Sequence, residues 1–452
     1  MTVYRGHLVH LTGNPTLPDA PRHLVGVPDG AIVVDDAGRI SYSGDFSALP
    51  PAADVVDVRP GFLLPGFIDT HIHFPQTHCA NAFGGGQLLN WLERCIFPAE
   101  SALADPLFAR KVARDFCSRR ISVGTTTALV FGSAFPDAQD ALFEESLRAG
   151  LRTISGRGIQ TVGPDSARLL TTSERAALEL VGSEISRWHA ADTRDPETAL
   201  LHAAVVPRFA LSVTRRTLAA LGELYDGVRG SGVYFHTHVS ENVDEIAAVR
   251  AMYDVDSYLD TYDGRFGPGS SVQGRTLLGP RSVLAHAVHS TDDELARMAD
   301  TGTSIAHCPT SQLFLGSGTM PWRRTVSRGV NVALGSDVAA GDEWLVPRVL
   351  NDCFKVHISE PAGAAVSLNG AELLYTATIA GARALALNDR IGNLDVGKEA
   401  DFVVIDPGQQ EVLAETLARI DPVDTAALLF TLLTGMRDAA VASVFVRGRK
   451  LR

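Results

Sequence analysis

The chain has 452 residues, 45% of them hydrophobic, and a formal net charge of -12, the composition of a folded protein able to bury a large core. Such an acidic chain, which has no dense Lys/Arg cluster, repels phosphate backbones and anionic lipid, so we expect no nucleic-acid partner. Its start lacks a basic, apolar leader, and no later run approaches about 18 uninterrupted apolar residues, so we also expect neither secretion nor a membrane span.

Residues 3–58 contain short β-type runs broken by turn residues, and residues 31–42 predict a hairpin around the Asp35–Gly38 turn. From about residue 65 to residue 388, β-like runs such as GFIDTHIH (66–73), GVYFHTH (232–238) and NVALGSD (331–337) alternate with longer helical segments. This alternation predicts an α/β fold with a parallel sheet, and the length favours a closed (β/α)8 TIM barrel.

After the barrel, residues 400–406 and 441–451 return to strand character, with a helical stretch at about 413–434 between them. Neither chain end has enough strands to bury a core alone. We therefore expect both ends to form one composite β-sandwich domain. The predicted domains are residues 1–64, the N-terminal part of the sandwich, residues 65–392, the barrel, and residues 393–452, the C-terminal part.

A metal site is indicated by histidines at the expected ends of barrel strands. His71 and His73 lie two residues apart in an apolar run, so both imidazoles project from the same face of one strand. An HxH pair alone is a weak signal. His238, His286 and Asp337, however, fall near the C-terminal ends of the fifth, sixth and eighth predicted strands, where barrel enzymes carry their chemistry.

These motifs resemble the amidohydrolase superfamily and, within it, the family of guanine deaminases, over nearly the whole chain. The motifs that carry the resemblance are DTHIHFPQ (69–76), LLNWLERCIFPAE (88–100), GTTTALVFG (124–132), PRFALS (207–212), HTHVSEN (236–242), CPTSQLFLGSG (308–318), LGSDVAAG (334–341) and IGNLDVGKEADFVVID (391–406). The resemblance implies one Zn²⁺ per subunit, with the ligands His71, His73, His238 and Asp337. Three imidazoles and a carboxylate suit zinc or iron better than magnesium or calcium.

Many members of the superfamily hold two metals bridged by a carboxylated lysine on a middle barrel strand. This sequence has no lysine between Lys111 and Lys355, so we predict a mononuclear site. His236 shares a strand face with His238, but the family pattern assigns the metal to His238, which leaves His236 as a polar barrel residue. The remaining candidates are given packing or surface roles: His78, His289 and His307.

The resemblance implies hydrolytic deamination of guanine to xanthine and ammonia by a metal-activated water. Glu241 follows a ligand strand and is the candidate proton shuttle, although a surface glutamate at a helix start is the alternative. Asp337 can bind the metal and also accept a proton from the water. His286 can donate a hydrogen bond to the oxygen of the tetrahedral intermediate and contact the substrate.

Base recognition requires hydrogen bonds in the plane of the ring and an apolar wall. Gln76 offers a donor and an acceptor from one amide, Arg208 offers a planar donor fork, and Phe209 offers a ring face. The resemblance assigns base binding to these three and to Trp91. Without it, Phe209 and Trp91 would be read as core residues.

The sequence departs from the family pattern at Ser311-Gln312, which commonly reads Ser-Asn, and after Gly156. Alternative substrates therefore stay open: a pterin, an 8-oxopurine or an s-triazine. Cyclic-amide hydrolysis is weakened by the missing lysine, and a non-enzymatic scaffold by the complete set of site residues. The five scattered cysteines form no CxxC, which excludes the other zinc deaminase class and favours a reducing cytoplasm. The family also implies a homodimer.

Overall fold

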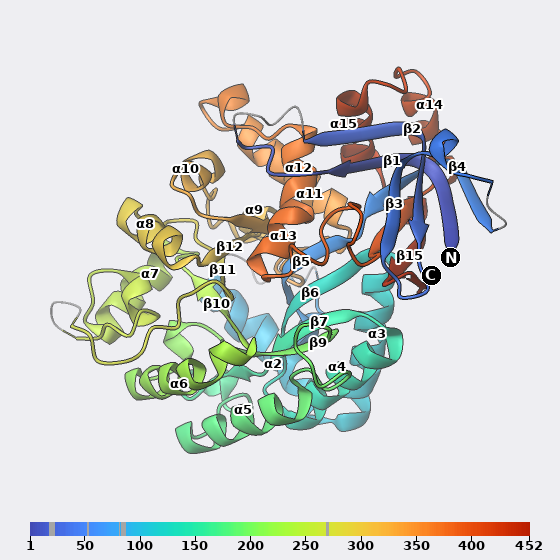
Figure 1. The fold of residues 1–452 in the computed structure, drawn as a ribbon. Coiled ribbons are helices and arrows are strands. Elements are labelled where there is room, and N and C mark those ends of the chain that lie inside the picture. Colours follow the sequence, from blue (N-terminus) through green and yellow to red (C-terminus); the bar gives the residue numbers. More distant parts are fainter. Residues whose placement is uncertain (18–22, 52–53, 81, 83–86, 268–270) are drawn as a thin grey trace. The chain divides into compact units, whose positions relative to one another are not determined.

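The computed structural model describes residues 1–17, 23–51, 54–80, 82, 87–267 and 271–452 (Figure 1). Two compact units are present. The first comprises Met1–Asp69, Ser118–Thr127 and Glu343–Arg452, and the second comprises Thr70–Cys117 and Ala128–Asp342. The domain boundaries derived from the sequence stay a prediction.

Both chain ends contribute to one seven-stranded mixed sheet. In spatial order its strands are β16 (Arg449–Lys450), β15 (Val441–Val446), β14 (Phe402–Ile405), β4 (Val55–Pro65), β1 (Thr2–Leu11), β2 (Leu24–Val34) and β3 (Ile40–Asp45). The N-terminal strand β4 pairs antiparallel with the C-terminal strand β14, and β1 pairs parallel with β4. The predicted composite β domain is confirmed.

The predicted hairpin connects β2 and β3. Its turn is held by the Asp35 carboxylate, which accepts hydrogen bonds from the backbone N–H groups of Ala37 at 2.9 Å and Arg39 at 2.8 Å. Gly38 has a φ of +75°, and a Cβ there would lie 2.2 Å from the carbonyl oxygen of Arg447. Glycine is therefore required at this position.

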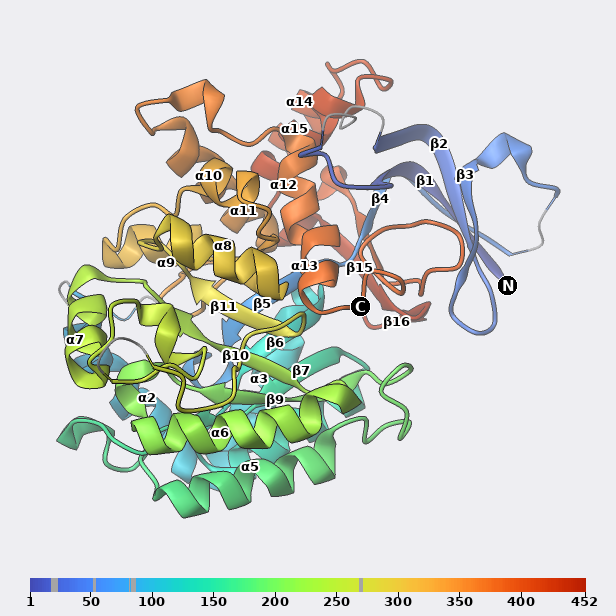
Figure 2. The same ribbon diagram turned by 60° about the vertical axis from the view of Figure 1, so that its left-hand side comes forward.

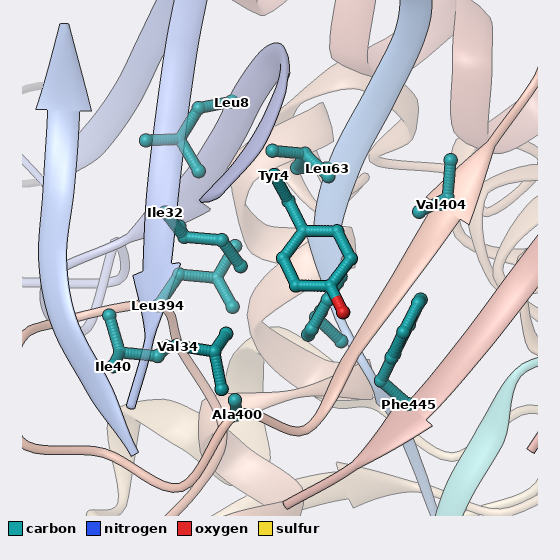
Figure 3. Packing of buried hydrophobic residues seen from close by; sticks show 11 residues of the cluster. Tyr4, Leu8, Ile32, Val34, Ile40, Leu63, Leu394, Ala400, Val404 and Phe445 are labelled. Atoms are coloured by element: carbon teal, nitrogen blue, oxygen red, sulfur yellow. The ribbon is translucent and has the colours of Figure 1, made fainter. Parts of the chain in front are cut away.

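Buried side chains from both chain ends pack together within this unit (Figure 3). The Tyr4 ring lies 5.0 Å from the rings of Phe402 and Phe445, in edge-on contact with each. Phe402 and Phe445 stack at 4.2 Å. Since the core needs aromatic residues from β1, β14 and β15, neither end of the chain can bury its own strands.

The helical stretch predicted at 413–434 is two helices, α14 (Glu411–Leu417) and α15 (Thr425–Gly435). The Asp424 side chain accepts a hydrogen bond from the backbone N–H of Ala427 at 3.1 Å and so begins α15. Pro422 lies between the helices and cannot continue one. The single-helix prediction was wrong because it did not weigh this proline and cap.

The central sheet is a parallel barrel. Its strands in order are β5 (Phe67–His73), β6 (Thr125–Phe131), β7 (Arg152–Gly156), β9 (Leu201–Pro207), β10 (Tyr234–Val239), β11 (Ser282–His286), β12 (Ser304–His307) and β13 (Val332–Leu334), and β8 (Gly158–Ile159) pairs with β9. The first strand meets the segment after the last, since the Asp337 N–H donates to the His71 carbonyl at 2.8 Å and the His73 N–H donates to the Val338 carbonyl at 3.1 Å. The predicted (β/α)8 barrel is confirmed.

Helices alternate with these strands, and α5 and α6 lie side by side (Figures 1 and 2). Those between or after barrel strands are α3 (Pro106–Ser122), α4 (Pro136–Ala149), α5 (Glu174–Trp188), α6 (Arg215–Val228), α7 (Val243–Tyr253), α8 (Asp292–Thr301), α10 (Trp322–Ser327) and α11 (Val346–Ile358). Shorter helices are α1 (Leu88–Trp91), α2 (Phe97–Ser101), α9 (Pro309–Leu315), α12 (Gly370–Ala377) and α13 (Ile379–Ala384). Within the described ranges, no helix combines the length and apolar character needed to cross a bilayer.

Candidate active site

The four predicted metal ligands lie together at the C-terminal ends of barrel strands. The Nε2 atom of His73 is 3.2 Å from the Nε2 atoms of both His71 and His238. Asp337 Oδ1 lies 3.1 Å from His71 Nε2 and 3.2 Å from His73 Nε2. Four donors at tetrahedral corners about 2.0 Å from a Zn²⁺ ion would be roughly 3.3 Å apart. The donor set therefore fits a small tetrahedral ion.

Two of these imidazoles are oriented by hydrogen bonds on their far side. His236 Nδ1 lies 2.8 Å from the Val283 carbonyl and His236 Nε2 lies 2.7 Å from His71 Nδ1. Because the carbonyl only accepts, His236 donates to it and accepts from His71. His238 Nδ1 donates to the Arg208 carbonyl at 2.6 Å. The Nε2 lone pairs of His71 and His238 thus face each other, as ligand imidazoles require.

Burial sets the charge states in this cluster. It lowers the pKa of His73 to about 4 and the pKa of His238 well below its usual value. Burial alone would raise the pKa of Asp337, but the adjacent His71 and His73 imidazoles hold it well below its usual value. Neutral imidazoles and an ionised carboxylate are the forms that bind a metal.

The backbone is strained where these strands end. Ser240, His286 and Asp337 have φ angles of +48°, +76° and +51°, in the left-handed region that non-glycine residues rarely adopt. Gly335 allows a close approach, since a Cβ there would lie 2.8 Å from His71 Cβ and 2.9 Å from Cys308 Sγ. The LGSD sequence therefore admits Asp337 to the cluster at a cost in backbone energy, as is common at functional sites.

Glu241 and His286 lie beside the four donors. His286 Nε2 is 3.5 Å from Glu241 Oε2 and 3.8 Å from Asp337 Oδ2, and neither nitrogen of its buried ring has a hydrogen-bond partner among the described residues. Burial lowers the pKa of His286 to about 3. Burial, followed by the charge of Asp337, raises the pKa of Glu241 well above its usual value. Ser317 Oγ donates to Glu241 Oε1 at 3.4 Å.

A pocket of about 400 Å³ opens onto this cluster. All the predicted substrate-binding residues line it, together with Glu241, Asp337 and two of the histidines: Gln76, Trp91, Arg208, Phe209 and His286. Trp91 is fixed by its indole N–H, which donates to the Ala82 carbonyl at 2.7 Å, and both Trp91 and Phe209 belong to a buried apolar cluster. The family-based and core interpretations of these two aromatic residues are therefore compatible.

Sequence reasoning missed Glu100, which connects two pocket residues. Its carboxylate accepts hydrogen bonds from Gln76 Nε2 at 2.8 Å and from Arg208 Nη1 at 2.5 Å. The Arg208 guanidinium also lies 5.3 Å from the centre of the Phe97 ring. The only available signal was that Glu100 ends the motif at residues 88–100.

A second missed residue, Glu245, supports the loop that carries Glu241. Glu245 Oε2 accepts hydrogen bonds from the backbone N–H groups of Glu241 at 3.1 Å and Asn242 at 3.3 Å, and Oε1 accepts one from the Tyr258 hydroxyl at 2.6 Å. The Asn242 side chain in turn accepts from the Asp244 N–H. This reciprocal cap could have been recognised from the Asn-x-x-Glu spacing at the start of α7.

The other histidines lie in different settings. His78 contacts Asp115 at 2.9 Å and is partly exposed, His289 contacts the Ser317 carbonyl at 2.8 Å, and His307 is buried. At the first departure from the family pattern, Gln312 is buried and accepts a hydrogen bond from the Met320 N–H. At the second, Arg157 forms a buried ion pair with Glu184.

Comparison with known proteins places the chain in a family. Residues 62–451 match the model of the Amidohydrolase family. The chain belongs to that family. A probable guanine deaminase of Deinococcus radiodurans is 41% identical to it, with 96% of this chain and 95% of the relative covered. The predicted resemblance, and with it the prediction of an enzyme, is confirmed.

Solved structures of other family members have the same fold. The structure of guanine deaminase from Escherichia coli matches with a TM-score of 0.87 at 32% identity, covering 99% of this chain and 98% of that one. The structure of a guanine deaminase from C. acetobutylicum, with guanine bound in its active site, matches with a TM-score of 0.85 at 25% identity and covers 99% of each chain. The barrel and the mixed sheet are thus the architecture of this amidohydrolase family.

Proposed function

We propose that the chain is a guanine deaminase that uses one zinc ion per subunit to convert guanine and water to xanthine and ammonia. The observation that carries this proposal is that a tetrahedral donor set and a set of planar hydrogen-bonding groups open into the same pocket. The similarity to guanine deaminases over nearly the whole chain supports the choice of substrate.

His71, His73, His238 and Asp337 would hold the ion. When bound, zinc lowers the pKa of a coordinated water to roughly 7, so that a nucleophile is available at neutral pH. The second ring nitrogens of His71 and His238 are already committed to His236 and to the Arg208 carbonyl. The ligands are therefore held in position before the ion arrives.

Glu241 is the proposed proton shuttle. Its raised pKa lets the carboxylate accept a proton from the attacking water and pass it to the ring nitrogen beside C2, and then to the departing amine. His286, whose ring nitrogens lack partners among the described residues, is proposed to donate a hydrogen bond to the oxygen that develops on C2. Asp337 Oδ2 faces His286 at 3.8 Å and fixes its approach.

Gln76 and Arg208 are proposed to bind the polar edge of the base, and Trp91 and Phe209 its flat faces. The remaining N–H groups of Arg208 suit the carbonyl of the purine, and the Gln76 amide offers both a donor and an acceptor. Aromatic walls favour a planar ring without fixing its orientation. The amide and the guanidinium therefore carry the discrimination between heterocycles.

The test combines metal analysis of the purified protein with an ammonia-release assay on a panel of rings: guanine, adenine, cytosine, isoxanthopterin, 8-oxoguanine and an amino-s-triazine. We expect one equivalent of zinc per chain and the highest kcat/KM for guanine. Robust turnover of another ring with negligible guanine turnover would transfer the proposal to that ring, and one equivalent of iron would change the metal. Release of a ring-opened product from a dihydropyrimidine would instead indicate a cyclic amidase.

We also propose that the enzyme is a cytoplasmic homodimer that acts in purine breakdown. Scattered cysteines without a paired motif suit a reducing compartment. Light scattering on the eluted protein tests the dimer, since a mass near 48.2 kDa would show a monomer.

A further inference from the structure

Glu100 is a buried carboxylate that contacts two of the proposed base-binding residues and none of the proposed metal ligands in its recorded hydrogen bonds. It lies on α2, is 5% exposed, and gives one oxygen to Gln76 Nε2 and the other to Arg208 Nη1. Gln76 and Arg208 are themselves 2% and 4% exposed. The three side chains thus form a dry network at one wall of the pocket.

The network fixes which way the Gln76 amide points. Its Oε1 accepts a hydrogen bond from the Ala339 N–H at 3.0 Å, while its Nε2 donates to Glu100. Rotating the amide by half a turn would set its N–H group against the Ala339 N–H and its oxygen against the carboxylate. Glu100 therefore leaves Gln76 with one defined free N–H and one defined free lone pair for a ligand.

Glu100 also cancels a charge. The Arg208 guanidinium is always protonated and is packed beside the rings of Phe97 and Phe131 at 5.3 and 5.9 Å. In such apolar surroundings a lone cation would attract any anion strongly, because charges interact more strongly where water is excluded. Paired with Glu100, Arg208 presents N–H donors with little net charge.

We propose that Glu100 is a positioning residue that orients Gln76 and neutralises Arg208, so that the pocket favours neutral guanine over the anion of its own product. This inference rests on the proposed function. Deamination replaces the amino group with a carbonyl, and xanthine loses a proton more readily than guanine. An unpaired Arg208 would hold the xanthine anion, and the carboxylate prevents that.

Glu100→Gln is the main test, because it keeps the size of the side chain and removes its charge. One of its two partners then meets an N–H group in place of an acceptor. We expect kcat/KM for guanine to fall about tenfold to a hundredfold, mainly through KM, with zinc content unchanged. In the opposite direction, we expect the inhibition constant of xanthine, measured at a pH where xanthine is anionic, to fall at least about tenfold.

Three further variants separate charge from structure. Glu100→Asp keeps the charge, so xanthine should stay a weak inhibitor even if KM for guanine rises. The double variant Glu100→Gln/Arg208→Gln contains no lone charge, so it should fold if the single variant does not and should also bind xanthine weakly. The control is Glu184→Gln, which makes the same change in the buried pair with Arg157 and should leave the ratio of the guanine KM to the xanthine inhibition constant unchanged.

The proposal is overturned if Glu100→Gln changes that ratio no more than Glu184→Gln does, or if the double variant binds xanthine tightly. A wild-type enzyme that does not deaminate guanine would instead overturn the proposed function. The two failures are distinguishable, because the second is seen before any substitution is made.

Discussion

Glu245 provides a pH-dependent test of how the Glu241 loop is built. The side chain is fully buried, and burial raises its pKa from 4.5 to about 7, although hydrogen bonds from Tyr258, Asn242 and Glu241 act in the opposite direction. Between pH 4.5 and pH 7 the folded protein therefore keeps a proton that the unfolded chain releases.

The sign and size of the effect follow from this difference. The stabilisation is complete below about pH 4.5 and is lost as pH rises through about 7, because the unfolded state binds fewer protons over that range. At about 1.4 kcal/mol for each pH unit, the shift from 4.5 to about 7 corresponds to roughly 3 kcal/mol of unfolding free energy.

Glu245→Gln should remove this dependence while keeping the contacts. The amide oxygen can accept from the two backbone N–H groups, and the amide nitrogen can donate to Tyr258, whose hydroxyl also accepts. Chemical denaturation of the zinc-loaded wild type and variant at pH 5, 6, 7 and 8 gives the difference in unfolding free energy. We expect the wild type to lose about 3 kcal/mol relative to the variant between pH 5 and pH 8.

Loss of one carboxylate at the surface is controlled by Glu179→Gln, at a side chain that is 61% exposed. Should the wild-type and Glu245→Gln curves remain parallel from pH 5 to pH 8, Glu245 is not the buried, proton-holding group described here.

Three further predictions concern the active site. Glu241→Gln should retain zinc and the fold but lose about 10²- to 10⁴-fold in kcat, measured by ammonia release; near-normal turnover would remove Glu241 from the shuttle role. His238→Ala should lose the metal, and full zinc occupancy by elemental analysis would contradict its assignment as a ligand. Arg208→Ala should raise KM for guanine with zinc intact, and unchanged kinetic constants would exclude Arg208 from base binding.

The barrel could be predicted from the sequence because its evidence is local and repeated. Each strand is a short apolar run, and parallel strands place their C-terminal ends at one edge, so the positions of His71, His238 and Asp337 along the chain already indicate a common site. The composite sheet could be predicted for a related reason, since strands at both ends need partners. The broken helix at 413–434 was missed because a proline was given too little weight.

The network around Gln76 could not be predicted, because it depends on side-chain contacts between distant segments. Glu100 meets Arg208, 108 positions along the chain, only because a π-helical turn at Leu92–Ile96 precedes α2. No pattern of residue types encodes that turn. The role of His236 was similarly beyond reach, since its contact with His71 requires β5 and β10 to face each other across the barrel.

These contacts together explain how an acidic pocket can admit a neutral, polar base. Asp337 would oppose the ion, Glu100 is paired with Arg208, and the raised pKa values of Glu241 and Glu245 favour their neutral forms. Each carboxylate in or beside the pocket thus either has a cationic partner or resists ionisation. A substrate then needs no charge of its own to enter, and selection depends on the hydrogen-bonding edge of the ring, where a single misplaced donor leaves a buried group unpaired.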